Sequence, residues 1–210
     1  IEEFKIDAEM SYSELIIPTS ETIKISHLLQ LAITNKKNLL FTGNTGTGKT
    51  LTIYNTLMSK FENESYTYIK MAFTAQTTTE LTQSIIEGKL TKSYRRFSPS
   101  KSRKGVLFID DLNMPERETF GAQPPIELLR QWLDYEGWYD LVSDNKEFVK
   151  IVDLSLVAAM GNVASGRTVS QRFIRHSIVQ FCDSYPQTTI FKIFSNVMDW
   201  FFKKTKLDNK

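Results

Sequence analysis

The chain has 210 residues, with 26 Lys and Arg against 24 Asp and Glu, and this near balance gives no electrostatic reason to expect nucleic acid or an acidic membrane surface as a partner. Its single cysteine, Cys182, excludes an intramolecular disulfide and, with only two histidines present, argues against a zinc site. No apolar run approaches the length of a membrane span, so we expect no membrane partner.

Extended apolar segments alternate with helical ones along the chain. The alternation predicts an α/β fold with a mostly parallel sheet flanked by helices. We expect strands at residues 38–43, 66–73, 105–111, 154–161 and 177–183, and helices at residues 50–60, 77–90 and 124–137.

Residues 91–105 carry six Lys or Arg, no acidic residue, and the aromatic residues Tyr94 and Phe97. We expect a solvated loop between a helix and a strand. The alternative is a basic surface that contacts nucleic acid or an acidic partner.

The segment after Pro186 repeats apolar residues at helical spacing, namely Ile190, Phe194, Val197 and Phe201. This pattern predicts a helix that packs against the rest of this domain or a following one. Asp199 and the scarcity of basic residues argue against a helix that lies on a membrane surface.

Residues 43–50 read GNTGTGKT and match the pattern G-x-x-x-x-G-K-[ST] between a predicted strand and a predicted helix. In such a loop, backbone N–H groups point at phosphate oxygens, and the positive end of the following helix favours the same anion. A Gly/Thr-rich turn is the alternative, but it does not explain the strand and helix on either side. We therefore predict binding of ATP or ADP with Mg²⁺, through Gly43, Asn44, Thr45, Gly46, Thr47, Gly48, Lys49 and Thr50.

Two of these residues have side-chain roles: Lys49 would reach the β- and γ-phosphates, and the Thr50 hydroxyl would ligate Mg²⁺. The second metal ligand is predicted in VLFIDD, a buried strand that ends in Asp110 and Asp111. Asp110 would hold Mg²⁺, directly or through water. Asp111 would orient the attacking water in a hydrolase. The alternative for Asp110 is a solvated carboxylate at a strand end.

Two arginines flank an aromatic residue in GRTVSQRFIRH, residues 166–176. Arg172 or Arg175 could complete the γ-phosphate site of a neighbouring protein unit, or could form ordinary surface ion pairs. Neither His27 nor His176 belongs to a recognisable catalytic or metal-binding group, so both are expected to be structural.

Several segments together resemble one protein family. The phosphate loop, LFIDDLNMP (107–115), FGAQPPIELLRQWLDYEGWYD (120–140) and SQRFIRH (170–176) look like a AAA+ module of a dynein heavy chain. The module they resemble most is the third of six in the motor ring, in the axonemal branch. The resemblance covers nearly the whole chain, and GAQPPIELLRQW is far more specific to these proteins than the phosphate loop is.

The resemblance implies a fold and further site residues. Residues 1–185 would form the α/β large subdomain of a AAA+ P-loop NTPase, and residues 186–210 the truncated start of its small helical lid. The segment SELIIPT (13–19) would lie along the adenine with Ile17 and Pro18 nearest, and Leu51 would join the nucleotide contacts. Arg172, with Arg175 as the alternative, would be an arginine finger that serves the preceding module's nucleotide.

The resemblance also implies a function. The chain would be a Mg·ATP-binding module of a microtubule motor, in the cytoplasm and cytoskeleton of a ciliary or flagellar axoneme. Its partners would be neighbouring modules of the same heavy chain, with microtubules engaged only through the parent motor. It would regulate the ring through its nucleotide state, with slow or no hydrolysis. The alternative is a catalytically active ATPase module, and a third reading, suggested by the basic stretch alone, is a nucleic-acid remodeller.

Three features depart from the usual AAA+ pattern. Asp111 stands where a glutamate is common, and its shorter carboxylate favours slow hydrolysis. Gly161 occupies the slot of the polar sensor residue, with Asn162 beside it. Asn44 replaces a common proline, which should matter little because the loop contacts phosphate through its backbone.

Overall fold

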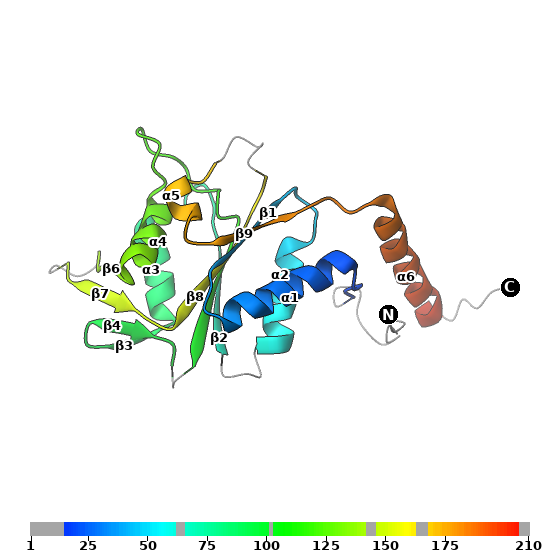
Figure 1. Ribbon diagram of the computed structural model, residues 1–210, viewed down its shortest axis with the longest axis horizontal. Coiled ribbons are helices and arrows are strands. Elements are labelled where there is room, and N and C mark those ends of the chain that lie inside the picture. Colours follow the sequence, from blue (N-terminus) through cyan, green and yellow to red (C-terminus); the bar gives the residue numbers. More distant parts are fainter. Residues whose placement is uncertain (1–14, 62–65, 101–102, 142–145, 163–167, 206–210) are drawn as a thin grey trace.

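The chain folds around a five-stranded parallel sheet with the order β2–β5–β8–β1–β9 (Figure 1). The computed structural model describes residues 15–61, 66–100, 103–141, 146–162 and 168–205. The strands are β1 (Leu39–Gly43), β2 (Tyr66–Ala72), β5 (Lys104–Asp110), β8 (Leu154–Met160) and β9 (Ile178–Cys182). The predicted α/β fold with a parallel sheet is confirmed, and each expected strand is present.

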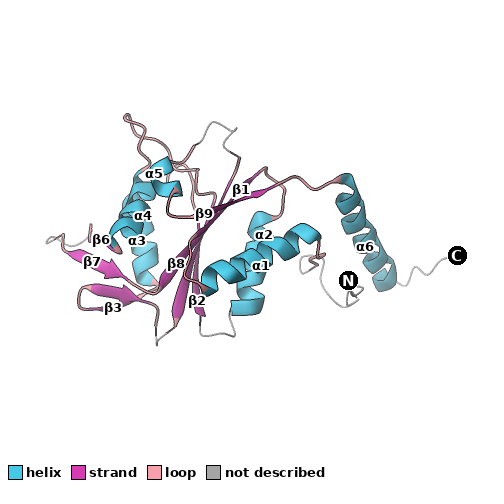
Figure 2. Cartoon of the chain, in the orientation of Figure 1, coloured by secondary structure: helices cyan, strands magenta, loops and turns pink. Residues whose placement is uncertain are grey.

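Helices cover both faces of this sheet, because apolar residues occupy consecutive strand positions that point to opposite faces (Figure 2). On one face, Phe41 and Phe108 pack with α1 (Ser20–Thr34) and α2 (Lys49–Thr56). On the other face, Leu40 and Leu107 pack with α3 (Thr79–Gly88) and α4 (Pro124–Tyr135). The sheet is therefore the middle of three layers.

Two helical features differ from expectation. The helix expected at residues 50–60 is α2 followed by a π-helical turn, η2 (Leu57–Phe61). Helix α1 was not expected from the sequence pattern. Its N-cap is Thr19, whose side chain accepts a hydrogen bond from the backbone N–H of Thr22 in a reciprocal capping box.

A second, smaller sheet has the strand order β3–β4–β7–β6. Its strands are β3 (Thr91–Ser93), β4 (Arg96–Ser98), β6 (Gly137–Tyr139) and β7 (Phe148–Ile151). The expectation of a solvated loop over residues 91–105 was wrong, because the segment folds back as the β3–β4 hairpin and buries Phe97 in the core. The flanking basic residues remain exposed, which accounts for the polar appearance of the segment.

The chain ends with α5 (Gln171–Ile174), β9 and α6 (Gln187–Thr205). Helix α6 confirms the predicted helical spacing and stands apart from the sheet, at the end of an extended connection (Figure 1). Much of its predicted apolar face is exposed, with Phe194 at 63% and Phe201 at 44%, whereas Trp200 beside it is buried. No helix in the described part of the chain is long and apolar enough to span a membrane.

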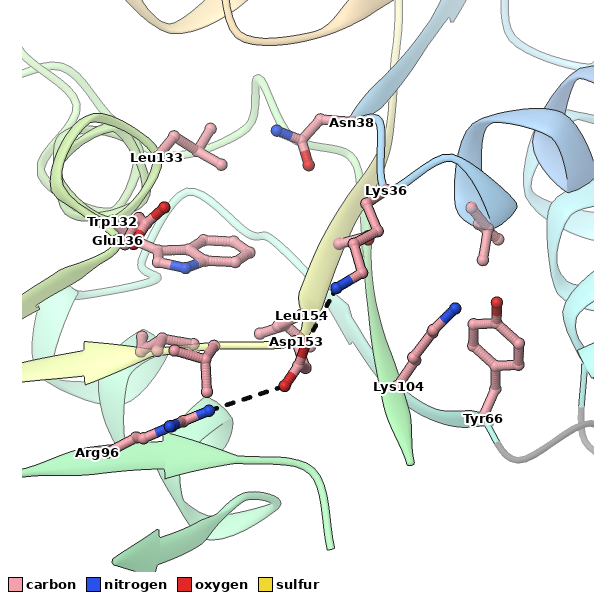
Figure 3. A pocket seen from close by; sticks show the side chains of 14 residues that line it. Lys36, Asn38, Tyr66, Arg96, Lys104, Trp132, Leu133, Glu136, Asp153 and Leu154 are labelled. Carbon is pink, nitrogen blue, oxygen red and sulfur yellow. Dashed lines mark hydrogen bonds and ion pairs between the residues drawn. The ribbon is translucent and has the colours of Figure 1, made fainter. Parts of the chain in front are cut away.

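A polar cavity of about 450 Å³ lies at the edge of the main sheet where the strands begin (Figure 3). In it, the Asp153 carboxylate pairs with Lys36 at 3.2 Å and with Arg96 at 3.9 Å. These pairs join the loop after α1 to the turn between β7 and β8 and to the smaller sheet. Ligands of open α/β sheets bind at the opposite, carboxyl edge, so we interpret this cavity as a structural joint.

Candidate nucleotide-binding site

The candidate site lies at the carboxyl edge of the main sheet, where loops follow β1, β5, β8 and β9. The loop after β1 contains residues 44–48 and leads directly into α2. Because β1 is a central strand with β8 and β9 as neighbours, the loops after all three strands meet around it. This edge is where ligands of open parallel sheets bind.

Three glycines give the loop after β1 its shape. Gly46 and Gly48 have φ values of +80° and +69°, a left-handed conformation that side chains other than glycine rarely adopt. Gly43 also has a positive φ, of +154°, and a Cβ there would lie 2.1 Å from the carbonyl oxygen of Cys182 in β9. Gly48 is also the N-cap of α2 and provides no side-chain cap. The first backbone N–H groups of α2 are therefore free of a side-chain cap at this position and can donate hydrogen bonds to an anion.

Lys49 lies in the centre of this loop and is only 9% exposed. Its Nζ donates hydrogen bonds to the carbonyl oxygens of Gly43 (3.0 Å) and Asn44 (2.6 Å) and to Thr47 Oγ1 (3.0 Å). Burial lowers the pKa of Lys49, and the nearby charges of Asp110 and Asp111 only partly offset this effect. Because the hydrogen-bond partners of this buried ammonium are neutral, it favours an anionic ligand, so the loop fits a phosphate group.

Thr50 and Asp110 bring two magnesium-type ligands together. The Thr50 hydroxyl donates to Asp110 Oδ1 at 3.0 Å, although the two residues are 60 positions apart in the sequence. Magnesium in nucleotide sites is usually held by one or two protein oxygens together with phosphates and water. Among the described residues no group of three or more His, Cys, Asp or Glu side chains could hold a metal alone. The pair therefore fits a magnesium ion that is shared with bound phosphate.

Asp111 follows at the end of β5 in the left-handed conformation, with a φ of +52°. Partial burial of its carboxyl group, together with the negative charge of Asp110, raises the pKa of Asp111, although much of the residue is exposed. Asp is among the few residue types that adopt this conformation without a large penalty. The carboxylate proposed to orient water thus lies on a tight turn beside the phosphate loop.

Asn44 links the loops that follow three strands. The Asn162 side chain, after β8, donates to Asn44 Oδ1 at 3.3 Å, and Asn44 Nδ2 donates to Ser184 Oγ, after β9, at 3.3 Å. Asn162 therefore contacts the phosphate loop, whereas Gly161 provides only its carbonyl oxygen, to Thr42. The sequence pattern had indicated no side-chain role for Asn44.

Sequence reasoning also missed Asn113, three residues after Asp110. Asn113 is buried, and its Nδ2 lies 3.9 Å from the position that a Cβ on Gly161 would occupy. An amide group thus lies next to the slot where a sensor side chain was expected. The only sequence signal was the position of Asn113 shortly after Asp110, the predicted magnesium ligand.

The two candidate finger arginines differ in their surroundings. Arg175 donates to Asp134 at 2.6 Å, and Asp134 also binds His176 (2.8 Å) and Arg130 (2.7 Å). Arg172 is exposed, and its side chain makes no hydrogen bond or ion pair with any other described residue. Arg175 and His176 therefore have structural partners, whereas Arg172 is available to another molecule.

The residues expected near the base are less closely grouped. Ile17 is buried and Leu51 is 51% exposed. A pocket of about 310 Å³ adjoins the phosphate loop at Thr47 and lies between α1 and β9, but Ile17, Pro18 and Leu51 do not line it. The structure thus brings together the phosphate loop, Asp110 and Asn162, whereas Arg172 makes no contact with this group.

A glycine-rich loop between a parallel strand and a helix, with a buried lysine and a Thr–Asp pair, defines an α/β fold of the P-loop NTPase class. The same fold is found in NtrX from Brucella abortus, solved in complex with ATP, with a TM-score of 0.56 and 16% identity over 94% of this chain and 45% of that one. Within this class, the chain belongs to the family described as the P-loop containing dynein motor region, whose model matches residues 4–185.

Relatives of this chain are axonemal dynein heavy chains. Dynein axonemal heavy chain 12 of Mus musculus is 41% identical over 199 residues, which cover 94% of this chain and 6% of that protein. Dynein axonemal heavy chain 1 of Homo sapiens is 43% identical over 199 residues, which cover 93% of this chain and 5% of that protein. The chain therefore spans about one twentieth of the length of these relatives.

Proposed function

We propose that the chain is a Mg·ATP-binding AAA+ module of an axonemal dynein heavy chain, the third of the motor ring. It regulates the ring through its nucleotide state and hydrolyses ATP slowly or not at all. The observation that carries the proposal is the buried Lys49 inside a glycine loop, beside the Thr50–Asp110 pair. The names of the relatives support the axonemal location and a place in a microtubule motor.

In this proposal each residue has a defined role. The loop from Gly43 to Thr50 binds the phosphates, and Thr50 and Asp110 would hold the magnesium ion, which neutralises phosphate charge when bound. Ile17, Pro18 and Leu51 contact the nucleoside side. Residues 1–185 form the large subdomain, and residues 186–210 begin the lid. Arg172 acts on the nucleotide of the preceding module. The proposed partners of this chain are the preceding and the following modules.

Slow hydrolysis follows from what surrounds the phosphates. Asp111 has a short carboxylate with a raised pKa, and Gly161 has no side chain to help position a water molecule. One observation favours the alternative of an active ATPase module: the Asn113 amide lies beside the Gly161 slot and could supply the missing polar group.

The test is substitution of Lys49. Calorimetry with ATP and Mg²⁺ should show that Lys49→Ala weakens binding roughly 100-fold or more, because the buried cation for the phosphates is lost. Since Lys49 also bonds three loop oxygens, circular dichroism must show that the variant is folded. Lys192→Ala, on the exposed face of α6, is the matched control. Unchanged ATP affinity in folded Lys49→Ala would contradict the proposal.

A further inference from the structure

The ends of β5 and β8 lie side by side at the carboxyl edge of the main sheet, next to the phosphate loop. The backbone N–H of Leu112 donates to the carbonyl oxygen of Ala159 at 3.0 Å, so the two segments continue together past Asp110. On the other side of β8, the Thr42 hydroxyl in β1 donates to the carbonyl oxygen of Gly161 at 3.4 Å. Gly161 therefore lies between the end of β5 and the start of the phosphate loop.

The alternation of side chains along β8 shows on which face a side chain at position 161 would lie. Val157 and Ala159 pack in one cluster with residues of α1 and α2, and side chains two positions apart in a strand share one face. Position 161 is the next member of this series, so it points to the side of the sheet that α2 covers. Asp110 lies on the same side, because it accepts a hydrogen bond from Thr50 of α2.

The Asn113 amide lies beside the missing side chain at position 161. Its Nδ2 is 3.9 Å from the position of a Cβ on Gly161, and apart from its chain neighbours that Cβ would meet no other atom of the described residues within 4 Å. Asn113 is only 4% exposed and belongs to a turn in which the Met114 N–H donates to the carbonyl oxygen of Asp111. A buried amide nitrogen is thus held on the α2 side of the sheet, just beyond the candidate magnesium ligand Asp110.

A nucleotide bound by the loop needs a hydrogen-bond donor at this point. Magnesium bridges the β- and γ-phosphates, so groups just beyond the metal ligand Asp110 face the γ-phosphate. The ionised carboxylates of Asp110 and Asp111 only accept hydrogen bonds and repel phosphate oxygens, whereas the Asn113 Nδ2 donates. Asn162, the other amide at this edge, donates to Asn44 Oδ1 at 3.3 Å.

We propose that Asn113 is a specificity-determining residue that recognises the γ-phosphate and so distinguishes ATP from ADP. Its Nδ2 donates to a γ-phosphate oxygen, a contact that ADP cannot make. The inference rests on the proposed function, because the loop must hold the other phosphates for the γ-phosphate to reach Asn113. It places the donor on the segment after β5, whereas the sequence pattern had placed a polar sensor at Gly161 or Asn162. The contact concerns binding, so it is compatible with slow hydrolysis.

The test compares Mg·ATP with Mg·ADP by calorimetry on the whole chain, with circular dichroism to show that each variant is folded. Asn113→Ala should weaken ATP binding roughly tenfold or more, the usual effect of losing a hydrogen bond to a charged group, and should leave ADP affinity within about twofold. Asn113→Asp keeps the shape of the side chain but removes the donor, so it should weaken ATP binding at least as much. Asn55→Ala, an exposed asparagine of α2, is the matched control.

A double variant, Asn113→Ala with Gly161→Asn, returns an amide to the same place from the neighbouring strand. The backbone of Gly161 is not in the left-handed region, and the space around its Cβ position is open, so an asparagine can be accommodated there. This variant should recover most of the ATP affinity that Asn113→Ala loses. Loss of packing around Asn113 alone would not be repaired by a side chain on β8.

An unchanged ratio of ATP to ADP affinity in folded Asn113→Ala would overturn the inference and leave the proposed function standing. An equal loss of affinity for both nucleotides would also overturn it, since this would indicate damage to the phosphate loop. Binding of neither nucleotide by the unaltered chain would remove the proposed function, and this inference with it.

Discussion

At the scale of single residues, the conformation of the phosphate loop depends on close packing against neighbouring backbone atoms. Gly43 packs against the backbone of Cys182, and Lys49 is enclosed by oxygens of its own loop. The two glycines Gly43 and Gly46 look equivalent in the sequence, but their surroundings differ, because a Cβ on Gly46 would meet no atom within 4 Å.

We therefore predict different costs for the same substitution at these two positions. Gly43→Ala should destabilise the protein by about 3 kcal/mol or more, because β1 and β9 would have to separate. Gly46→Ala should cost only about 1–2 kcal/mol, the strain of a left-handed alanine. Urea unfolding of both variants measures the difference. Similar free energies of unfolding would show that β9 does not approach β1 so closely.

A second prediction concerns Asp110. Asp110→Asn should weaken ATP binding roughly tenfold in the presence of Mg²⁺ and much less in the presence of a chelator, because the carboxylate is proposed to act through the ion. Titration calorimetry under both conditions is the measurement, with Asp199→Asn on α6 as the control. An equal loss with and without the metal would instead indicate a distorted β5.

The residues of the phosphate loop and Asp110 could be predicted because their chemistry depends on short motifs. Asn113 could not, since its position beside Gly161 brings together the segments after β5 and β8, which are distant in the sequence. The side-chain role of Asn44 was missed for the same reason.

At the scale of elements, one carboxylate joins α4 to α5 and to the residues before β9. Asp134 binds Arg130 on its own helix and Arg175 and His176 beyond α5. Burial alone would raise the pKa of Asp134, but the hydrogen bond and charge of Arg175, with His176 and Arg130, lower it overall. This network fixes the short helix that carries Arg172.

Asp134→Asn should destabilise the protein by about 1 kcal/mol near neutral pH, a modest effect because Arg175 is largely exposed. A lowered pKa means that this stabilisation is complete above the unfolded-state pKa of about 3.9 and is lost as the pH falls through the folded-state pKa. The difference in unfolding free energy between protein and variant should therefore shrink below about pH 4. Glu80→Gln is the control, and a difference that grew on acidification would contradict the network.

The main elements followed from the sequence because buried strands and amphipathic helices have strong patterns. The buried residues of α1, Ile25, Leu29, Ala32 and Ile33, do follow helical spacing, but the exposed apolar residues Ile23 and Leu31 blur this stripe in the sequence, and the helix was missed. The smaller sheet was missed because its strands are only three or four residues long and depend on pairing between segments far apart in the chain.

At the scale of the whole molecule, the described residues contain a candidate phosphate site, but none of the described arginines forms a hydrogen bond or ion pair with it. Arg172 is exposed, and its side chain forms no hydrogen bond or ion pair with the phosphate loop. Hydrolysis needs a positive charge near the γ-phosphate, and the absence of an arginine finger can reduce the rate by about 10³–10⁵-fold.

The chain alone should therefore hydrolyse ATP very slowly or not at all, and Asp111→Glu should restore little activity. A phosphate-release assay on the purified chain, with Lys49→Ala as the background, is the measurement. Turnover of about once per second or faster, abolished in that background, would favour a self-sufficient ATPase.

The separation of α6 from the sheet has a consequence for how the molecule unfolds. The four phenylalanines of α6 are 44–75% exposed and Trp200 is its one buried residue, so few tertiary contacts stabilise the helix, and most helical stability in proteins comes from such contacts. Amide hydrogens of α6 should therefore exchange with solvent orders of magnitude faster than those of β1, β5 and β8, and the helix should melt before the three-layered body does. The chain would then lose its structure in two stages instead of one cooperative transition.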